Sequence, residues 1–421
     1  MPNKKIAGHF LTCGLGGLLI LGLLLPALVT GCTLFQAEQG LAAPVEELDG
    51  RLVRANNSFG LNIFQALRAA EDEENLFISP ASIFTALAMT YNGAEAETRQ
   101  AMAKTLDLED MTREEVNEAF ADLLTILHNP DPRVEMAVAN SLWAREGVDF
   151  KKDFLQRNED FFNAEVTALD FGDPGAADII NDWVNEQTGG KIEDIVEAPI
   201  DPLTVLFLIN TIYFHGEWSE PFDPELTREI PFYLADGSVK EHPVMFKNDD
   251  FSYFETDLFQ AIRLPYGENE RLGMYVFLPS EQAGLKEFYE ELDPQKWAEW
   301  TESFTTREGE VGLPRFKFEY EKSLNDVLKA LGMGIAFDYE AADFSGMREI
   351  PPRLYISEVK HKSFVEVNEE GTEAAAATSV EIRVESARPD YFSMVVDRPF
   401  FFAIADDMTG PILFMGAVLE P

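Results

Sequence analysis

Apolar residues in the first third of the chain recur at the spacing of helices. Ile63, Phe64, Leu67 and Ala70 share one face of a predicted helix. The pair Ser79–Pro80 predicts the start of a second helix, because serine caps a helix N-terminus well and proline fits the first turn.

Capping signals bound the second and third helices. Asn92 and Gly93 predict the end of the second helix. The third helix begins at Thr112, three residues before Glu115, in the pattern of a capping box. Its apolar face is formed at helical spacing by Val116, Phe120, Leu123, Leu124 and Leu127.

The later part of the chain changes to strand patterns. Residues 204–214 form a continuous apolar run that predicts a strand buried on both faces. Residues 359–367 alternate between two faces, one of which consists of Val359, His361, Ser363, Val365 and Val367. Residues 400–404 and 412–418 predict a core hairpin around a turn at 406–410. Helices followed by strands, with the two mixed, predict an α+β fold with large mixed sheets.

Composition limits both the organisation and the partners. Of the 421 residues, 46 % are hydrophobic, so the chain is able to bury a sizeable core. Residues 51–421 contain no Gly/Ser-rich linker, repeat or low-complexity run and predict a single domain. The formal charge of −42 excludes binding of nucleic acid or anionic lipid through a general electrostatic field.

The N-terminus has the pattern of an export signal. Lys4 and Lys5 precede an uncharged, leucine-rich stretch that ends in small residues before Cys32. This ending is similar to bacterial lipoprotein signals, which predicts removal of residues 1–31, lipidation of Cys32 as a membrane anchor, and a tether at residues 32–50. The chain is therefore expected to be exported as a cell-surface lipoprotein. Ordinary secretion into the extracellular space is the alternative.

Catalytic and metal-binding patterns are absent from the sequence. Its two cysteines and five histidines have no zinc-binding spacing, and neither a phosphate-binding glycine loop nor a nucleophile elbow is present. Ser357 and Lys360 match a short serine–lysine pattern of hydrolases, but the motifs that would accompany it are missing. We therefore expect no metal ion and no cofactor.

The segment from 367 to 389 is unusual for a connection between two strands. About twenty residues without settled secondary structure are rare within a domain and are usually functional. Thr372, the alanines at 374–377 and Thr378 are all small, so this segment is able to enter between two existing strands, and Gly371 lets the backbone turn. Composition alone leaves an exposed helix open, because Glu373 and the alanines favour helix formation.

Four segments, in order along the chain, resemble the serpin family. Asn75–Ala94 is similar to the second helix of serpins, and Leu208–Trp218 resembles the third strand of their main sheet. Residues 367–389 resemble the hinge and reactive-centre loop, and Val396–Phe402 resembles the C-terminal signature. The chain departs from many serpins at His215, where they carry lysine. The resemblance implies a serpin fold with about nine helices, three β-sheets and an exposed reactive-centre loop at about residues 369–390.

The resemblance also implies roles for individual residues. The hinge, where the loop begins, corresponds to Glu369, Glu370, Gly371, Thr372, Glu373, Ala374, Ala375, Ala376 and Ala377. The shutter, a polar group beneath the main sheet, corresponds to Ser79, Ser82, Asn210 and His361, which need hydrogen-bond partners if they are buried. The breach, where insertion starts, corresponds to Trp218, Arg315 and Glu369, and the last two are expected to form an ion pair.

As a serpin, the chain would be an inhibitor rather than an enzyme, and it would inhibit a serine protease by acting as a suicide substrate. The protease cuts the loop, becomes an acyl-enzyme, and is trapped when the loop inserts into the main sheet. The small residues of the hinge agree with an inhibitor. A non-inhibitory binding or storage protein with the serpin fold is the alternative.

Counting from the hinge gives a reactive bond. Inhibitory serpins usually carry the reactive bond seventeen residues from the hinge glutamate. With Glu369 counted as the first, the seventeenth residue is Glu385, so the resemblance implies the bond Glu385–Ser386 and a glutamyl-specific target. Cleavage after Arg383 by a trypsin-like protease, or after Val384 by an elastase-like protease, is the alternative. We expect a monomer. We also expect no binding of a heparin-type polyanion, because residues 114–127, which match the heparin-binding helix of some serpins, contain no lysine or arginine.

Overall fold

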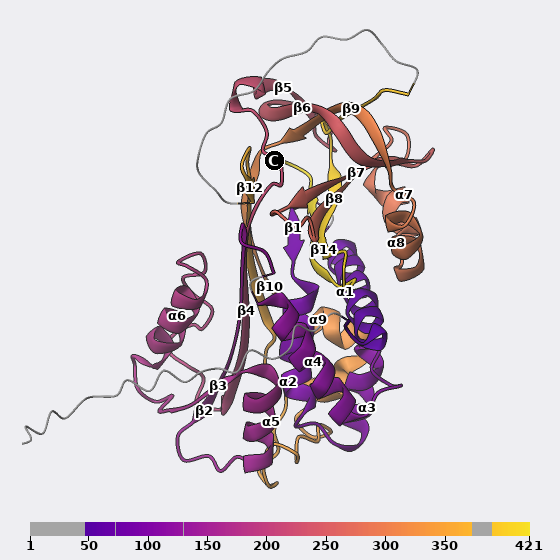
Figure 1. Cartoon of the computed structure of the whole chain (residues 1–421). Coiled ribbons are helices and arrows are strands. Elements are labelled where there is room, and N and C mark those ends of the chain that lie inside the picture. Colours follow the sequence, from indigo (N-terminus) through magenta and orange to yellow (C-terminus); the bar gives the residue numbers. More distant parts are fainter. Residues whose placement is uncertain (1–46, 72, 129, 373–389) are drawn as a thin grey trace, which may run out of the picture. The chain divides into compact units, whose positions relative to one another are not determined.

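Two β-sheets with helices packed against them form the framework of the protein (Figure 1). The computed structural model describes residues 47–71, 73–128, 130–372 and 390–421, all of which fall within one compact unit. The helices are α1 (Gly50–Ala70), α2 (Pro80–Tyr91), α3 (Ala96–Thr105), α4 (Arg113–Leu127), α5 (Lys152–Phe162), α6 (Ala176–Gln187), α7 (Gly284–Glu291), α8 (Pro294–Thr301) and α9 (Asn325–Leu328). These nine α-helices of the described residues agree with the expected number.

The capping signals predict the ends of α2 and α4 correctly. Ser79 caps α2 by accepting a hydrogen bond from the amide of Ser82, and Asn92 forms its C-cap. Thr112 and Glu115 form the reciprocal hydrogen bonds of a capping box at the start of α4. Eleven of the twelve residues of α2 are buried, because this helix contacts strands of both sheets.

A nine-stranded sheet contains the C-terminal hairpin. Its strands are β1 (Leu76–Ile78), β5 (Arg228–Tyr233), β6 (Val239–Glu255), β7 (Phe259–Tyr266), β8 (Leu272–Pro279), β9 (Thr305–Pro314), β13 (Phe392–Val395), β14 (Phe400–Asp406) and β15 (Ile412–Val418). Their order is β1-β15-β14-β8-β7-β6-β9-β13, and β5 pairs with β6. The predicted core hairpin corresponds to β14 and β15, in which every residue is buried.

The number of sheets differs from the expected three within the described residues. The long strand β6 pairs with β5 through residues 239–244, with β9 through 244–253, and with β7 through 252–255. Because one continuous strand belongs to all of these ladders, it joins two groups of strands into a single hydrogen-bonded sheet.

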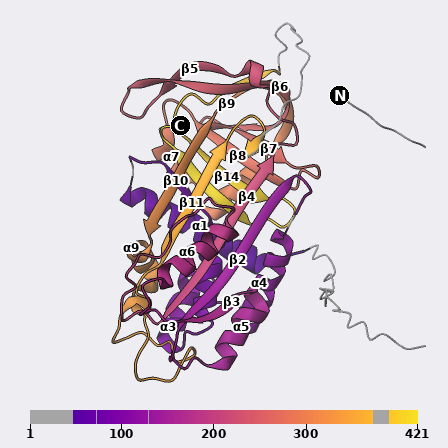
Figure 2. The ribbon, with the colours of Figure 1, turned by 90° about the vertical axis from the view of Figure 1, so that its left-hand side faces the viewer.

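A six-stranded sheet holds the segments that resemble the main sheet of serpins. Its strands are β2 (Val134–Arg145), β3 (Glu165–Leu169), β4 (Leu206–Glu217), β10 (Phe316–Ser323), β11 (Lys360–Val367) and the short β12 (Gly371–Thr372), in the order β10-β11-β12-β4-β2-β3 (Figure 2). The alternation predicted for 359–367 is confirmed in β11, where His361, Ser363, Val365 and Val367 are buried and the residues between them are half-buried.

The expectation that β4 is buried on both faces is only partly met. Four of its twelve residues are buried, namely Ile209, Thr211, Phe214 and Gly216. In the described part of the sheet, β12 is the strand that joins β4 to β11, and no ladder pairs these two directly. One edge of β4 therefore lacks a backbone partner below β12, which leaves neighbouring side chains half-exposed. We call this unpaired boundary between β4 and β11 the seam.

Helices cover the two faces of the six-stranded sheet. Helix α6 packs Ile180 and Val184 against Trp143 of β2 and Ile209 of β4 on one face, and α2 contacts β4 on the other (Figure 1). Among the described residues, no helix combines the length and apolar character needed to cross a bilayer. Nor do histidine, cysteine and carboxylate side chains in these ranges gather into a group that could hold a metal ion.

Candidate functional site

A tight turn connects β11 to β12 at the top of the seam. The amide of Asn368 donates to the carbonyl of Gly371 over 2.9 Å, and the amide of Glu370 donates to the side chain of Asn368 over 3.0 Å. Gly371 has φ +154°, and a Cβ atom there would lie 2.0 Å from the carbonyl oxygen of Gly216. Only glycine therefore permits β12 to pair so closely with β4.

Thr372 is the first residue of the loop that is buried between both flanking strands. It lies opposite Val367 of β11 and Gly216 of β4. Its hydroxyl is 2.8 Å from the hydroxyl of Tyr266, a side chain whose pKa is raised by burial. The ring of Tyr266 stacks on Trp218 with 4.5 Å between centroids. Thr372 is thus fixed to the aromatic layer beneath the sheet.

Trp218 and Phe222 hold the hinge turn through hydrogen bonds. The backbone amide of Trp218 donates to the carbonyl of Glu370 over 2.8 Å, and its indole nitrogen donates to the carbonyl of Asn368 over 3.0 Å. The amide of Phe222 donates to the carbonyl of Glu369 over 2.8 Å. The segment that follows β4 therefore binds three successive residues of the turn.

Glu369 is a buried carboxylate with two side-chain partners. The Nε atom of Arg315 donates to both of its oxygens over 2.9 Å, and Thr227 donates from its hydroxyl. Burial opposes ionisation of Glu369, but the hydrogen bonds from Arg315 and Thr227 outweigh it and hold the pKa of the carboxyl below its ordinary value. The three residues of the expected breach, Trp218, Arg315 and Glu369, are therefore brought together around the turn.

Three of the four expected shutter residues also meet. The hydroxyl of Ser79 donates to the carbonyl of Leu413 over 2.8 Å and accepts from the amide of Ser82 over 3.2 Å. The amide of Ser79 donates to Nε2 of His361 over 3.3 Å. Burial lowers the pKa of His361 to about 4, so its ring is neutral at pH 7 and accepts this hydrogen bond.

Asn210 does not join this group. Its amide group donates to Oδ1 of Asn140 over 2.6 Å, and its own Oδ1 is buried without a hydrogen-bond partner in the described structure. The seam explains the separation. Extending the registers of β12 places Asn210 on β4 and His361 on β11 opposite the same loop position, on either side of one missing strand. Of the four expected shutter residues, three therefore contact one another, and Asn210 lies on the other side of the seam.

A comparison with known protein families shows to which family the chain belongs. Residues 54–421 match the family model described as "Serpin (serine protease inhibitor)". The chain belongs to the serpin family. Serpins are protease inhibitors rather than enzymes, so the prediction that this chain is not an enzyme agrees with its family.

Curated relatives of this serpin include named inhibitors. This chain is 38 % identical to Serpin B6 of Pongo abelii over 380 residues, which cover 88 % of this chain and 99 % of the relative. It is 37 % identical to the leukocyte elastase inhibitor of Bos taurus, with 88 % of this chain and 100 % of that protein covered.

Solved structures show that the fold is shared by serpins of different function. The native state of the thermophilic serpin Tengpin matches with a TM-score of 0.81 and 34 % identity, covering 90 % of this chain and 97 % of that one. Human thyroxine-binding globulin in complex with its hormone matches with a TM-score of 0.79 and 26 % identity, covering 88 % and 98 %. The serpin fold is therefore found both in relatives named as inhibitors and in thyroxine-binding globulin.

Several predicted residues of this serpin lie outside the described residues. They are the hinge residues Glu373, Ala374, Ala375, Ala376 and Ala377, the reactive-bond candidates Arg383, Val384, Glu385 and Ser386, and Cys32. Their assigned roles remain predictions.

Sequence reasoning missed four contributors to the site. Asn140 is a polar residue within an apolar strand, and the argument applied to Asn210 could have found it. Ser363, which donates to the carbonyl of Phe77 over 2.6 Å, was placed on the buried face of β11 but given no role. No sequence pattern indicated a role for Tyr266 or Thr227, because their contacts depend on packing between segments that are distant in sequence.

Proposed function

We propose that this serpin is a serine protease inhibitor that acts as a suicide substrate. The serine hydroxyl of the protease attacks the carbonyl of the reactive bond, the ester to the cut loop forms, and the new N-terminus leaves. The freed loop then follows β12 into the seam and carries the attached protease with it. Deformation of the protease prevents hydrolysis of the ester.

The position of β12 carries this proposal. Gly371 and Thr372 already pair with β4 on one side, and Thr372 pairs with Val367 of β11 on the other. Continuing these registers would place loop residues 374, 376 and 378 on the buried side of the sheet, opposite Val365, Ser363 and His361. The sequence has Ala374, Ala376 and Thr378 at these positions, so no large side chain opposes insertion.

The length of β4 sets the extent of insertion. In the same register, Leu206 at the start of β4 would lie opposite residue 382, ten residues beyond Thr372. At a net 0.5–1.5 kcal/mol for each backbone hydrogen bond, a strand of this length supplies on the order of 10 kcal/mol. The candidate bonds after Arg383, Val384 and Glu385 lie just past this limit, so cleavage at any of them frees a strand long enough to fill the seam.

The target is proposed from the residue before the reactive bond. Glu385–Ser386 suggests a glutamyl-specific protease, and bonds after Arg383 or Val384 suggest trypsin-like or elastase-like enzymes. The test is incubation with one protease of each kind, followed by a denaturing gel and mass spectrometry. We expect a covalent band with the glutamyl-specific enzyme and a released fragment that begins at Ser386. A different first residue overturns the choice of bond, and cleavage without any covalent band overturns inhibition.

The second candidate function is a non-inhibitory carrier, which the similarity to thyroxine-binding globulin supports. The small residues after Gly371 weigh against it, because a carrier has no need of an insertable loop. The same gel separates the two functions, because a non-inhibitory carrier that is cleaved forms no covalent band with any of the proteases.

The location of the protein is proposed from the N-terminal sequence. Export followed by lipidation of Cys32 would attach the inhibitor to a membrane surface, where secreted proteases act. The test is metabolic labelling of the full chain with a fatty acid. Loss of label in Cys32→Ser, with export retained, supports the anchor; equal labelling of both chains contradicts it.

A further inference from the structure

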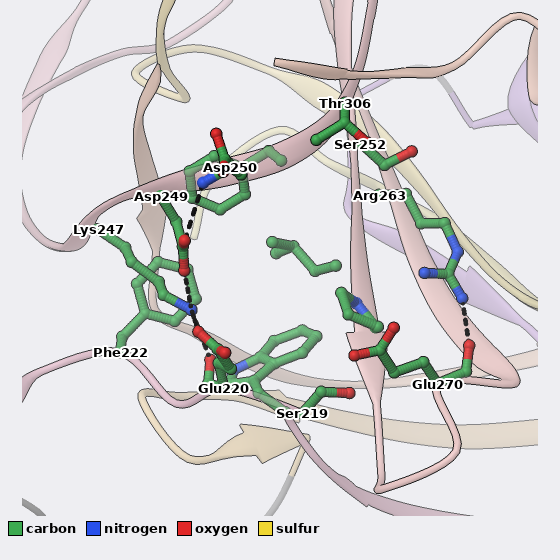
Figure 3. Close-up of a pocket in the computed structure, with 14 residues that line it drawn as sticks. Ser219, Glu220, Phe222, Lys247, Asp249, Asp250, Ser252, Arg263, Glu270 and Thr306 are labelled. Carbon is green, nitrogen blue, oxygen red and sulfur yellow. Dashed lines mark hydrogen bonds and ion pairs between the residues drawn. The ribbon is translucent and has the colours of Figure 1, made fainter. Parts of the chain in front are cut away.

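A pocket borders residues 218–222, the segment that holds the hinge turn. Ser219, Glu220 and Phe222 line this pocket of about 260 Å³, whose other walls come from β6, β7, the turn after β7 and Thr306 of β9 (Figure 3). A wall beside a pocket lacks packing partners on that side. The position of the segment therefore depends on the hydrogen bonds that its backbone makes with neighbouring elements.

Arg133, immediately before β2, makes several of these hydrogen bonds. Its guanidinium donates to the carbonyl of Gly267 over 2.7 Å, to that of Ser219 over 3.3 Å and to that of Trp218 over 3.5 Å. Its Nε atom is buried without a hydrogen-bond partner in the described structure, so the two terminal nitrogens make all three bonds. Arginine suits this position, because its planar fork reaches several acceptors at once.

Asp131 joins Arg133 to the turn after β7. Its buried carboxylate accepts hydrogen bonds from the amide of Arg133 over 2.8 Å and from the amides of Glu268 and Asn269 over 2.9 and 2.8 Å. Burial opposes ionisation of Asp131, but these backbone hydrogen bonds outweigh it and hold the pKa of the carboxyl below its ordinary value. Gly267 permits the close approach, since a Cβ atom there would lie 2.3 Å from the carboxyl carbon.

Backbone hydrogen bonds place the segment between Arg133 and this turn. The amide of Ser219 donates to the carbonyl of Pro265 over 2.9 Å, and the amide of Gly267 donates to the carbonyl of Glu217 over 2.9 Å. The amide of Glu217 donates in turn to the carbonyl of Arg133 over 3.1 Å. Arg133 therefore binds both the segment and the turn on which the segment rests.

We infer that Arg133, oriented by Asp131, is a positioning residue for insertion of the loop. It holds the segment against the turn after β7, so that the amides of Trp218 and Phe222 stay directed at the carbonyls of the hinge turn. Insertion then begins from one fixed point, and β12 keeps its register with β4. The role in insertion rests on the proposed function, whereas the hold on the hinge turn does not.

A matched control lies at the other end of the twelve-residue β2. Arg145 is half-buried, as Arg133 is, and its guanidinium also donates to backbone carbonyls, those of Thr204 over 2.6 Å and Asp201 over 3.1 Å. The amide of Thr204 donates to the carbonyl of Asp201 over 2.9 Å. Hydrogen exchange of this amide therefore reports on Arg145, as exchange of the Trp218 amide reports on Arg133.

Hydrogen exchange of the intact chain tests the hold on the hinge turn. In Arg133→Gln, the amides of Trp218 and Phe222 should exchange about ten-fold faster, while the amide of Thr204 keeps its rate. Arg145→Gln should give the reverse result. Equal acceleration of all three amides in Arg133→Gln would indicate a general loss of stability, and an unchanged rate at Trp218 would mean that Arg133 positions nothing. Either result overturns the assignment.

Arg133→Lys separates the fork of the guanidinium from its charge. Lysine keeps the positive charge but reaches fewer carbonyls, so the Trp218 amide should exchange nearly as fast as in Arg133→Gln. This variant also decides the question if Arg133→Gln does not fold. Exchange as slow as in the unmodified chain would overturn positioning by the guanidinium.

The role in insertion is measured with a protease that forms the covalent band with the unmodified chain. We expect Arg133→Gln to be cleaved at about the unmodified rate but to give about three-fold less covalent complex per cleavage, because a loosened hinge turn delays insertion and leaves time for hydrolysis of the ester. Arg145→Gln should keep the unmodified ratio. Equal ratios for the three chains overturn the role in insertion.

Failure of the proposed function gives a different result. In that case the unmodified chain itself forms no covalent complex with any protease. The exchange rates of the Trp218 and Thr204 amides still decide whether Arg133 holds the hinge turn, because they are measured without a protease.

Discussion

Glu369 is the residue on which the contacts around the hinge converge. Its side chain is 7 % exposed, whereas that of Arg315 is 44 % exposed, so the pair joins a buried carboxylate to a guanidinium at the surface. A buried charge is unfavourable without such partners. Arg315 therefore supplies the charged partner of this carboxylate, and the hydroxyl of Thr227 supplies a second, neutral one.

Replacing this carboxylate should loosen the turn. We expect Glu369→Gln to lower the stability of the intact protein by about 1–3 kcal/mol at pH 7, since the charge-assisted hydrogen bonds are lost. The control Glu366→Gln removes the surface pair with Lys317 and should cost about 0–1 kcal/mol. Urea unfolding measures both.

The same variant gives a pH test. The folded pKa of Glu369 is depressed, so its contribution is complete above the unfolded pKa and is lost as pH falls through the folded value. The difference between the unmodified chain and Glu369→Gln should therefore shrink below about pH 4. An undiminished difference at pH 3 would mean that the charge is not what stabilises the turn.

His361 predicts a pH dependence in a different range. Its pKa is about 4 in the folded protein and about 6.5 in the unfolded chain, so the unfolded chain binds more protons between these values. Stability should rise with pH across this window, by on the order of 3 kcal/mol, and be complete above it. The His361→Gln variant should lose this rise between pH 5 and 6.5 in thermal melts at one scan rate. Parallel profiles for the two proteins would contradict a buried neutral histidine.

At the scale of elements, β12 is the strand at which the proposed insertion of the loop would begin. Thr372 is 4 % exposed and lies between two strands, so an arginine there would place a charge in the sheet without a partner. We expect Thr372→Arg to turn the inhibitor into a substrate: cleaved protein accumulates and the covalent band falls at least ten-fold. Thr372→Ser keeps the hydroxyl that faces Tyr266 and should inhibit normally. Equal covalent complex with Thr372→Arg would refute insertion through β12.

The strands show how far a pattern along the chain predicts an element. The alternation in β11 gave both the strand and its buried face, because side-chain direction in a strand depends only on local backbone geometry. The apolar run in β4 predicted the strand correctly but overestimated its burial. Burial of β4 depends on whether a neighbouring strand pairs with its edge. The 17-residue β6 was not predicted at all, because polar residues such as Lys247 and Asp249 break any simple period.

The sequence predicts which residues belong to the site better than it predicts the distances between them. Motif resemblance pointed to Trp218, Arg315 and Glu369, and the structure brings them together. It also pointed to Asn210 beside His361, which the seam keeps apart. Whether two strands touch or are separated by the width of a third is a property of the whole sheet. No local pattern in either strand records it.

At the scale of the whole molecule, the proposed function predicts that the intact protein is less stable than the form with its loop inserted into the seam. Both β4 and β11 present edges without a ladder partner below Thr372 in the described structure, and exposed edges readily accept a strand. About ten strand residues would supply on the order of 10 kcal/mol, which corresponds to a rise in melting temperature on the order of 10 °C for a domain of this size.

Cutting the loop without a trapped protease isolates this gain. A cysteine protease that cleaves between residues 373 and 389, verified by mass spectrometry, should yield a protein that melts on the order of 10 °C higher than the intact chain. The cleaved Thr372→Arg variant is the control, because it carries the same cut but cannot begin insertion at β12. Its melting temperature should stay near that of its intact form. If the cleaved unmodified chain melts no higher than the intact one, the seam does not accept the loop, and the carrier function becomes the better account of this fold.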